Sequence, residues 1–168
     1  MIHALEQIWT MTQYRKGKII WEETKKNLIP LEGEKALVDT FYRNNGSTYF
    51  LDGNTFYIGL YYGSVAEATV LSNVPEWLGG FGYARQAVER SDSNVGWPII
   101  QMDENNWRVV SKTVTITAAG GAIGPINGAF LCTTLDNTGV LIGAVSMSVA
   151  RTIPAGDWTQ FSIRAKQK

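Results

Sequence analysis

The residue types that carry most enzyme chemistry are scarce in this sequence. His3 is the only histidine, close to the N-terminus, and Cys132 is the only cysteine among 168 residues. Histidine is the usual general base and a common zinc ligand, so Cys–His, Ser-His-Asp and zinc mechanisms all lack a central group. We therefore expect a protein that is not an enzyme and that holds no cofactor.

The single cysteine lies in an apolar stretch, residues 129–133. A reactive thiol would need a nearby cation or a helix N-terminus to favour the thiolate, whereas an apolar setting suits a small buried side chain. We expect Cys132 to be such a buried side chain. One cysteine also excludes a disulfide within the chain.

Two pairs of adjacent acidic residues could supply a general acid and a general base: Asp103 with Glu104, and Glu22 with Glu23. Neighbouring side chains in a strand point to opposite faces, so neither pair could flank one glycosidic bond. Glycoside hydrolysis by these residues is not expected.

Two further acidic segments, Asp52-Gly53-Asn54 and Asp136-Asn137, offer oxygen ligands to a calcium ion. Neither follows the alternating acidic pattern of an EF-hand loop. Asp and Asn side chains often bond to the backbone two residues further on, which makes them common in turns. These segments are predicted to be turns, and no metal site is expected.

The clearest structural signal is residues 107–117. Hydroxyl side chains occupy every second position from Ser111 to Thr117, and Val114 and Ile116 lie between them. This alternation is typical of a half-buried strand.

The same kind of segment recurs towards the C-terminus between Gly, Pro and Asn turns. The further strands are expected at residues 55–62, 125–135, 140–149 and 158–166. Strands at such spacing predict a mainly β protein, an antiparallel β-sandwich with a jelly-roll-like arrangement. Apolar residues on both faces of residues 55–62 place that strand in the middle of a sheet.

One segment has helical spacing. Leu37, Val38, Phe41 and Tyr42 recur at the spacing of a helix face, and acidic residues stand near its start. We expect one short helix near residues 32–43, laid on a sheet.

Residues 1–30 are predicted to be either an extended N-terminal arm that pairs with a neighbouring subunit or the first strand of the chain's own sheet. Residues 31–168 are expected to form a single β-rich domain. If the arm is correct, deleting residues 1–21 should leave the body folded.

Charge is low overall and unevenly distributed. Only 18% of residues are charged, against about 25% in typical soluble domains. Residues 1–30, 31–104 and 105–168 carry net charges of +2, −6 and +4. Acidic and basic faces of neighbouring copies could meet in an assembly, or the surface could simply be mixed and solvated.

The sequence shows no dense basic cluster, no signal peptide and no membrane span, so neither nucleic acid nor a membrane is an expected partner.

Several short sequence segments within residues 17–165 resemble a group of small virion structural proteins of tailed bacteriophages. These segments are Gly17-Lys18-Ile19-Ile20-Trp21-Glu22-Glu23, Asn27-Leu28-Ile29, Glu32-Gly33-Glu34-Lys35, Phe41-Tyr42-Arg43-Asn44, Phe56-Tyr57-Ile58-Gly59-Leu60-Tyr61, Gly82-Tyr83-Ala84-Arg85, Trp97-Pro98-Ile99 and Ile123-Gly124-Pro125-Ile126. The resemblance implies a particle component that is made in the infected bacterial cytoplasm and works in many copies. It leaves head and tail locations open.

On this basis we expect a capsid decoration or cement protein, a homo-oligomer with a trimer favoured, bound to the major capsid protein or other virion proteins. The alternative is a tail or tail-fibre component that binds the host surface or glycans through aromatic side chains. An enzyme that acts on cell-wall polysaccharide is a weaker competitor. The residues expected at the partner interface are Ile8, Trp9, Tyr14, Ile19, Trp21, Trp77, Phe81 and Trp97.

Overall fold

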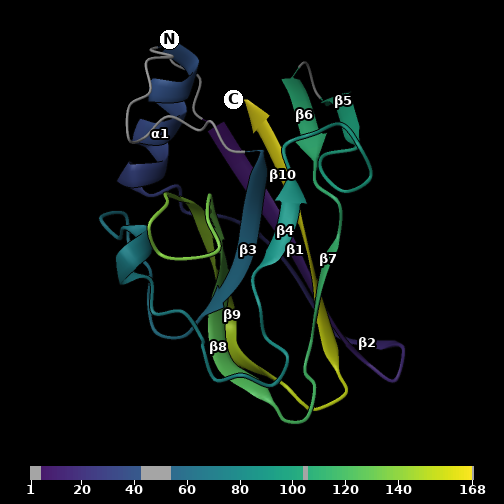
Figure 1. The fold of residues 1–168 in the computed structure, drawn as a ribbon. Helices are drawn as coiled ribbons and strands as arrows, with labels where there is room; N and C mark the ends of the chain where they lie inside the picture. The colour runs from purple at the N-terminus through teal and green to yellow at the C-terminus, as the bar shows by residue number, and fades with distance from the viewer. Residues whose placement is uncertain (1–4, 43–53, 104–105, 168) are drawn as a thin grey trace.

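The computed structural model describes residues 5–42, 54–103 and 106–167, which form two antiparallel sheets and one helix (Figure 1). Sheet A has the order β2 (Lys18–Lys26), β1 (Leu5–Arg15), β10 (Trp158–Gln167), β6 (Asn106–Val110) and β5 (Ile99–Asp103), with β7 (Val114–Thr117) also paired to β10. Sheet B has the order β4 (Gln86–Glu89), β3 (Thr55–Tyr61), β8 (Ile123–Cys132) and β9 (Leu141–Ile153). The mainly β, sandwich-like fold expected from the sequence is confirmed, while the jelly-roll connectivity remains a prediction.

The hydrophobic core lies between the two sheets. Sheet A contributes Trp9, Met11 and Phe161, and sheet B contributes Ile58 and Leu131, all of them fully or almost fully buried. Alternate residues of each strand face this layer, since successive side chains of a strand point to opposite faces. Strand β3 lies between β4 and β8, in the middle of its sheet as its apolar sequence predicts.

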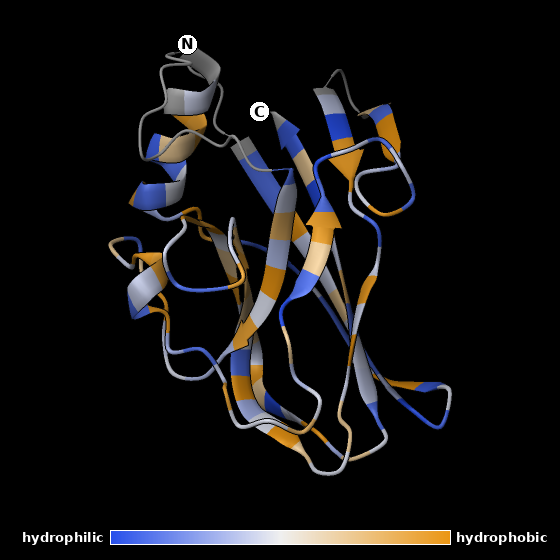
Figure 2. Cartoon of the chain, in the orientation of Figure 1, coloured by the Kyte–Doolittle hydropathy of each residue, from blue (hydrophilic) through white to orange (hydrophobic). Residues whose placement is uncertain are grey.

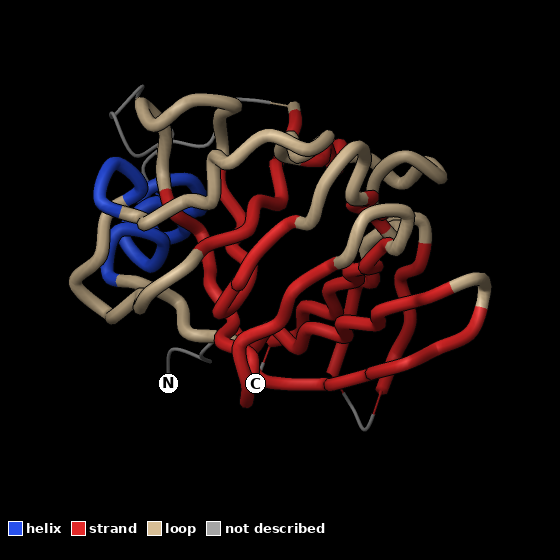
Figure 3. Tube along the Cα trace, turned by 90° about the horizontal axis from the view of Figure 1, so that it is seen from below, coloured by secondary structure: helices blue, strands red, loops and turns tan. Residues whose placement is uncertain are grey.

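The helix α1 (Leu31–Tyr42) agrees with the predicted one and lies beside the strands at one side of the sandwich (Figure 3). Its first turn is very close to β9. A Cβ atom on Gly33 would lie 2.7 Å from the carbonyl oxygens of Leu141 and Ile142, so only glycine fits there. The Glu32 carboxylate accepts hydrogen bonds from the backbone N–H groups of Leu71 and Leu141, at 2.9 and 2.8 Å. These contacts fix the helix to sheet B.

Two alternatives were predicted for the N-terminal segment: an extended arm that pairs with a neighbouring subunit, or the first strand of the chain's own sheet. An extended arm is not found among the described residues. Instead β1 pairs with β10 over its whole length, from Leu5↔Gln167 to Tyr14↔Trp158, and with β2 on its other side. Residues from Leu5 onward therefore pair within the chain's own sheet, which agrees with the first-strand alternative, and the extended arm is not confirmed.

The strand predicted at residues 107–117 is interrupted. Strands β6 and β7 follow the same partner, β10, but the chain bulges between them at residues 111–113. Ser111 fills this gap: its backbone N–H donates to Ile163 O, and its Oγ accepts from Ile163 N at 2.9 Å. The predicted alternation still holds beyond the bulge, because Val114 and Ile116 are buried while Thr115 and Thr117 are exposed.

The segment between β3 and β6 is the least regular, as the sequence indicated. Its described residues form the short 3₁₀ turn at Leu71–Asn73 and the strands β4 and β5, and the rest of them have no regular structure. Within the described residues, no helix has the length and apolar character that crossing a membrane requires.

Candidate interaction site

The acidic pair on β2 has structural partners on opposite sides of the strand. Glu22 Oε2 accepts a hydrogen bond from Thr12 Oγ1 at 3.1 Å, whereas Glu23 accepts from the backbone and hydroxyl of Ser148 on β9. Partial burial raises the pKa of Glu23, but the bonds from Ser148 and Lys25 outweigh it and lower that pKa. The two carboxylates thus face apart and do not form a catalytic pair. His3 and the side chains of the other acidic pair lie outside the described part of the chain.

Asp136 forms the turn that its sequence suggested. Its Oδ1 accepts from the backbone N–H of Thr138 at 2.9 Å and from the Thr138 hydroxyl at 2.6 Å, and these bonds lower the pKa of Asp136. Asp52 lies outside the described residues. Over the ranges that the structure describes, no three His, Cys, Asp or Glu side chains are grouped so that they could hold a metal ion.

One buried ion pair joins the irregular middle segment to sheet B. Arg85 and Glu76 meet in two parallel contacts, Nη2 to Oε2 at 2.6 Å and Nε to Oε1 at 2.9 Å, and their side chains are 3% and 7% exposed. Arg85 Nη1 also donates to the carbonyl oxygens of Thr134 and Asp136. Burial lowers the pKa of Arg85, but its bonds and charge pairing with Glu76 outweigh this and raise it. Buried charges with this many partners are typical of a structural clamp.

Two titratable neighbours complete this network. The Tyr83 hydroxyl donates to Glu76 at 2.7 Å and accepts from Leu60 N at 2.8 Å, and burial raises the pKa of Tyr83. Burial also raises the pKa of the Cys132 thiol to about 11, despite nearby Arg85. Cys132 is therefore protonated at neutral pH, and the predicted small buried side chain is confirmed.

The aromatic residues expected at a partner surface in the middle segment pack largely on one another. The Trp77 ring lies 6.5 Å from Phe81 and 5.8 Å edge-on from Tyr83, measured between ring centroids. Phe81 remains 47% exposed. Trp97 is not part of this cluster and lines a pocket described below.

The expected interface residues of the N-terminal hairpin lie in different environments. Trp9 is fully buried, so it offers no surface to a partner. Tyr14 stacks on Trp158, and Trp21 lies under the guanidinium of Arg151 at 4.7 Å. Ile8 lines a second pocket of about 480 Å³ on the outer face of sheet A, and Ile19 is 57% exposed near the hairpin turn.

The two edge strands of sheet A carry exposed apolar side chains, and the C-terminal half of β2 is bridged to β9 by hydrogen bonds of Glu23 and Lys25. On β5, Ile99, Ile100 and Met102 are 46%, 68% and 60% exposed. On β2, at the opposite edge, Ile19 and Ile20 are 57% and 45% exposed. Figure 2 shows this hydrophobic colouring on β5 and its neighbour β6. An unpaired edge strand presents free N–H and C=O groups, so apolar edges of this kind favour pairing with another chain.

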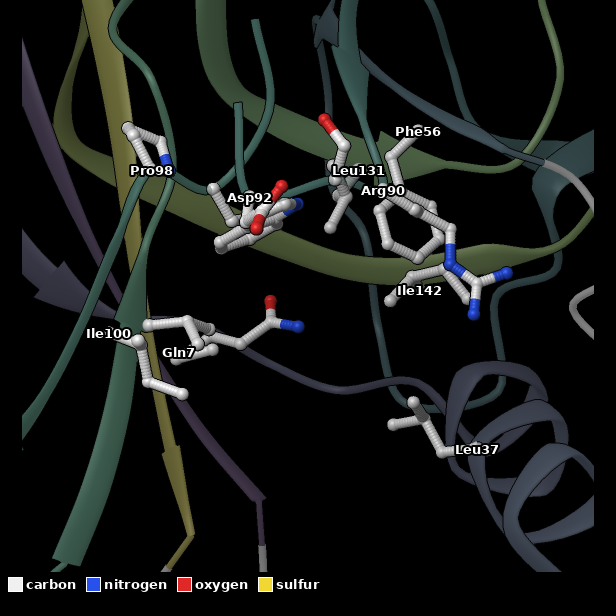
Figure 4. A pocket seen from close by; sticks show the side chains of 13 residues that line it. Gln7, Leu37, Phe56, Arg90, Asp92, Pro98, Ile100, Leu131 and Ile142 are labelled. Atoms are coloured by element: carbon white, nitrogen blue, oxygen red, sulfur yellow. The ribbon is translucent and has the colours of Figure 1, made fainter. Parts of the chain in front are cut away.

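A pocket of about 490 Å³ opens between the two sheets at one end of the sandwich (Figure 4). One wall is a single row of paired residues across sheet A: Gln7, Ala165, Val109 and Ile100. The facing wall and the rim come from sheet B, the helix and the segment before β5: Phe56, Leu131, Ile142, Leu37, Arg90, Ser91, Asp92, Trp97 and Pro98. The pocket is therefore mainly apolar.

The structure brings together only part of what the sequence suggested. Of the expected interface residues, Trp77 and Phe81 form one cluster and Trp97 belongs to the pocket. The β5 edge and Gln7 were not anticipated. Ile99 and Ile100 stand in an irregular segment without alternation, and Gln7 is a polar residue at a position that faces inward.

Comparisons with known proteins give the chain no relatives. It matches no protein-family model, no curated protein and no solved structure.

Proposed function

We propose that the chain is a structural component of a tailed-phage virion, a head decoration or cement protein that acts as a homo-oligomer, with a trimer favoured. The observation that carries this proposal is the pair of apolar edge strands of sheet A, β5 and β2. The resemblance of the sequence to small virion proteins supplies the context. The particle is assembled in the host bacterial cytoplasm.

The placement of these edges favours a ring. Strands β5 and β2 lie at opposite ends of the same sheet. A contact between β5 of one copy and β2 of the next joins two different surfaces. Such a contact can repeat from copy to copy, and it forms a closed ring when the rotation between neighbouring copies adds up to a full turn. Closure of three copies would bury every apolar edge and leave the outer face of sheet A and the loops for the major capsid protein or other virion proteins.

The mechanism is stabilisation by mass action. A protein that binds only the assembled shell lowers the free energy of that shell relative to its separated parts, by an amount that grows with concentration. Many copies repeat this effect over the particle. No proton transfer or bond cleavage is required, which accords with Glu22 and Glu23 facing apart.

The alternative, a tail or tail-fibre component that binds glycans, would use Trp77 and Trp97 as stacking surfaces. Trp77 packs against Phe81 and Tyr83, and Trp97 faces the pocket between the sheets. The two rings therefore do not form one platform for a sugar chain, and the geometry supports the decoration role more strongly.

Ile99→Lys is expected to convert the trimer of 18.6 kDa chains into a monomer. A charge on β5 opposes burial of that edge, since edge lysines block strand pairing. Ile20→Lys on β2 should have the same effect, because the ring uses both edges. Sedimentation equilibrium at micromolar to 100 μM concentrations would measure both variants.

Leu135→Lys is the matched control, because Leu135 is 64% exposed in the turn between β8 and β9, away from sheet A. It should sediment as wild type does. A wild-type protein that stays monomeric at the highest concentration would contradict the ring. So would an assembly that Ile99→Lys abolishes and Ile20→Lys leaves intact, which indicates a two-fold β5–β5 contact instead.

A further inference from the structure

The pocket between the sheets contains one polar group whose hydrogen bonding is incomplete. Gln7 is only 3% exposed, and its side-chain Oε1 accepts a hydrogen bond from Asn27 Nδ2 at 2.7 Å. Among the described residues, Gln7 Nε2 has no hydrogen-bond partner. Gln7 Nε2 is not sealed from solvent, because the fully buried unpaired side-chain atoms of the described residues are Trp9 Nε1, Arg151 Nε and Arg164 Nε. It is therefore a donor that faces the pocket and can bind water or the oxygen of a ligand there.

The orientation of the Gln7 amide is fixed. The backbone N–H of Asn27 donates to Gln7 O at 3.0 Å, which holds the two residues side by side. Gly143 makes room for their side chains, because a Cβ atom there would lie 2.6 Å from Gln7 Oε1. With Oε1 turned to Asn27, the amide nitrogen points into the space between the sheets (Figure 4).

The rest of the pocket selects for an apolar and uncharged molecule. Leu37, Leu131 and Ile142 line it together with the aromatic and aliphatic residues named above. The rim carries Arg90 and Asp92, one positive and one negative side chain, so the pocket does not favour a ligand of either charge. The volume of about 490 Å³ lies within the roughly 300–1,000 Å³ of small-molecule sites.

We propose that this pocket binds a small, neutral, mainly apolar molecule that presents one carbonyl-type oxygen to Gln7 Nε2. The apolar body displaces water from between the sheets, and the oxygen accepts the hydrogen bond that Gln7 Nε2 would otherwise give to that water. This binding site goes beyond the proposed structural role because it lies between the sheets, although Ile100 belongs both to its wall and to the β5 edge.

Two probes of nearly equal shape test the proposal: 2-acetylnaphthalene, which has a carbonyl oxygen, and 2-ethylnaphthalene, which has none. Both are titrated into the full-length protein, with quenching of tryptophan fluorescence and calorimetry as readouts. The ketone is expected to bind about tenfold more tightly, because only its oxygen replaces the water that Gln7 Nε2 loses when the pocket fills. Equal affinities, or no binding up to the solubility limit, would overturn the proposal.

Two variants locate the site. Ala165→Leu places a larger side chain on the pocket wall and should weaken both probes at least about tenfold. Gln7→Met keeps the side-chain volume and should remove the preference for the ketone. Ala87→Leu, on an exposed position of β4, makes the same change as Ala165→Leu elsewhere and should bind as wild type does. If Gln7→Met does not fold, the two probes and Ala165→Leu still decide the matter: binding unchanged by Ala165→Leu would refute the site.

Discussion

Replacing Arg85 by Met is expected to lower the free energy of unfolding by about 3–5 kcal/mol, because it leaves the Glu76 carboxylate buried without its cation. Glu76 is 7% exposed, so water cannot take the place of the guanidinium. The variant also removes the donors that hold the carbonyl groups of Thr134 and Asp136. The loops before β4 and after β8 would then lose their common anchor.

Urea denaturation followed by circular dichroism measures this loss. Lys18→Met is the control, because Lys18 is exposed near the hairpin turn and its loss leaves no buried carboxylate unpaired, so it should cost less than about 0.5 kcal/mol. The double variant Arg85→Met/Glu76→Met should recover part of the loss, since it leaves no unpaired buried charge. A loss below about 1 kcal/mol for Arg85→Met alone would show that the clamp is not structural.

Deletion of residues 1–21 is expected to unfold the chain, the opposite of what a free N-terminal arm predicts. The deletion removes all of β1, so β10 loses its longest strand pairing and keeps only β6 and β7. It also removes Trp9 and Met11, both 0% exposed, from the centre of the core. Near-ultraviolet circular dichroism and heat-induced unfolding of the truncated protein would measure the result.

A single substitution in β1 also tests whether this strand belongs to the core, without removing a whole segment. Trp9→Ala should cost about 3–5 kcal/mol, because it leaves a large cavity between the sheets. Ile19→Ala, on an exposed position of the same hairpin, should change stability by less than about 0.5 kcal/mol. A truncated protein that kept its tertiary circular dichroism signal would restore the arm interpretation.

Most of the strands and the helix could be predicted from the sequence because their apolar residues follow a clear period. The alternation around Val114 and Ile116, and the helical spacing around Leu37, follow directly from burial of one face. Strand β1 was harder to assign. Its inward positions include the polar residues Gln7 and Gln13, which blur the alternation, and Gln13 is satisfied only by a distant carbonyl, Thr152 O at 2.9 Å.

The candidate site was much less predictable, because it depends on pairing between segments far apart in the sequence. The pocket wall exists only because β1, β10, β6 and β5 lie next to one another and bring Gln7, Ala165, Val109 and Ile100 into one row. The clamp partners Arg85 and Glu76 follow no recognisable motif. Exposure of the β5 edge likewise depends on which strands end each sheet, and no local pattern encodes it.

The most direct test of the proposed role is to look for the protein on tailed-phage particles released from cells that carry its gene. Purified particles would be labelled with a gold-tagged antibody against the recombinant chain and viewed by negative-stain electron microscopy. The decoration role predicts many gold particles spread over the head. Particles without label, or label confined to the tail, would contradict it.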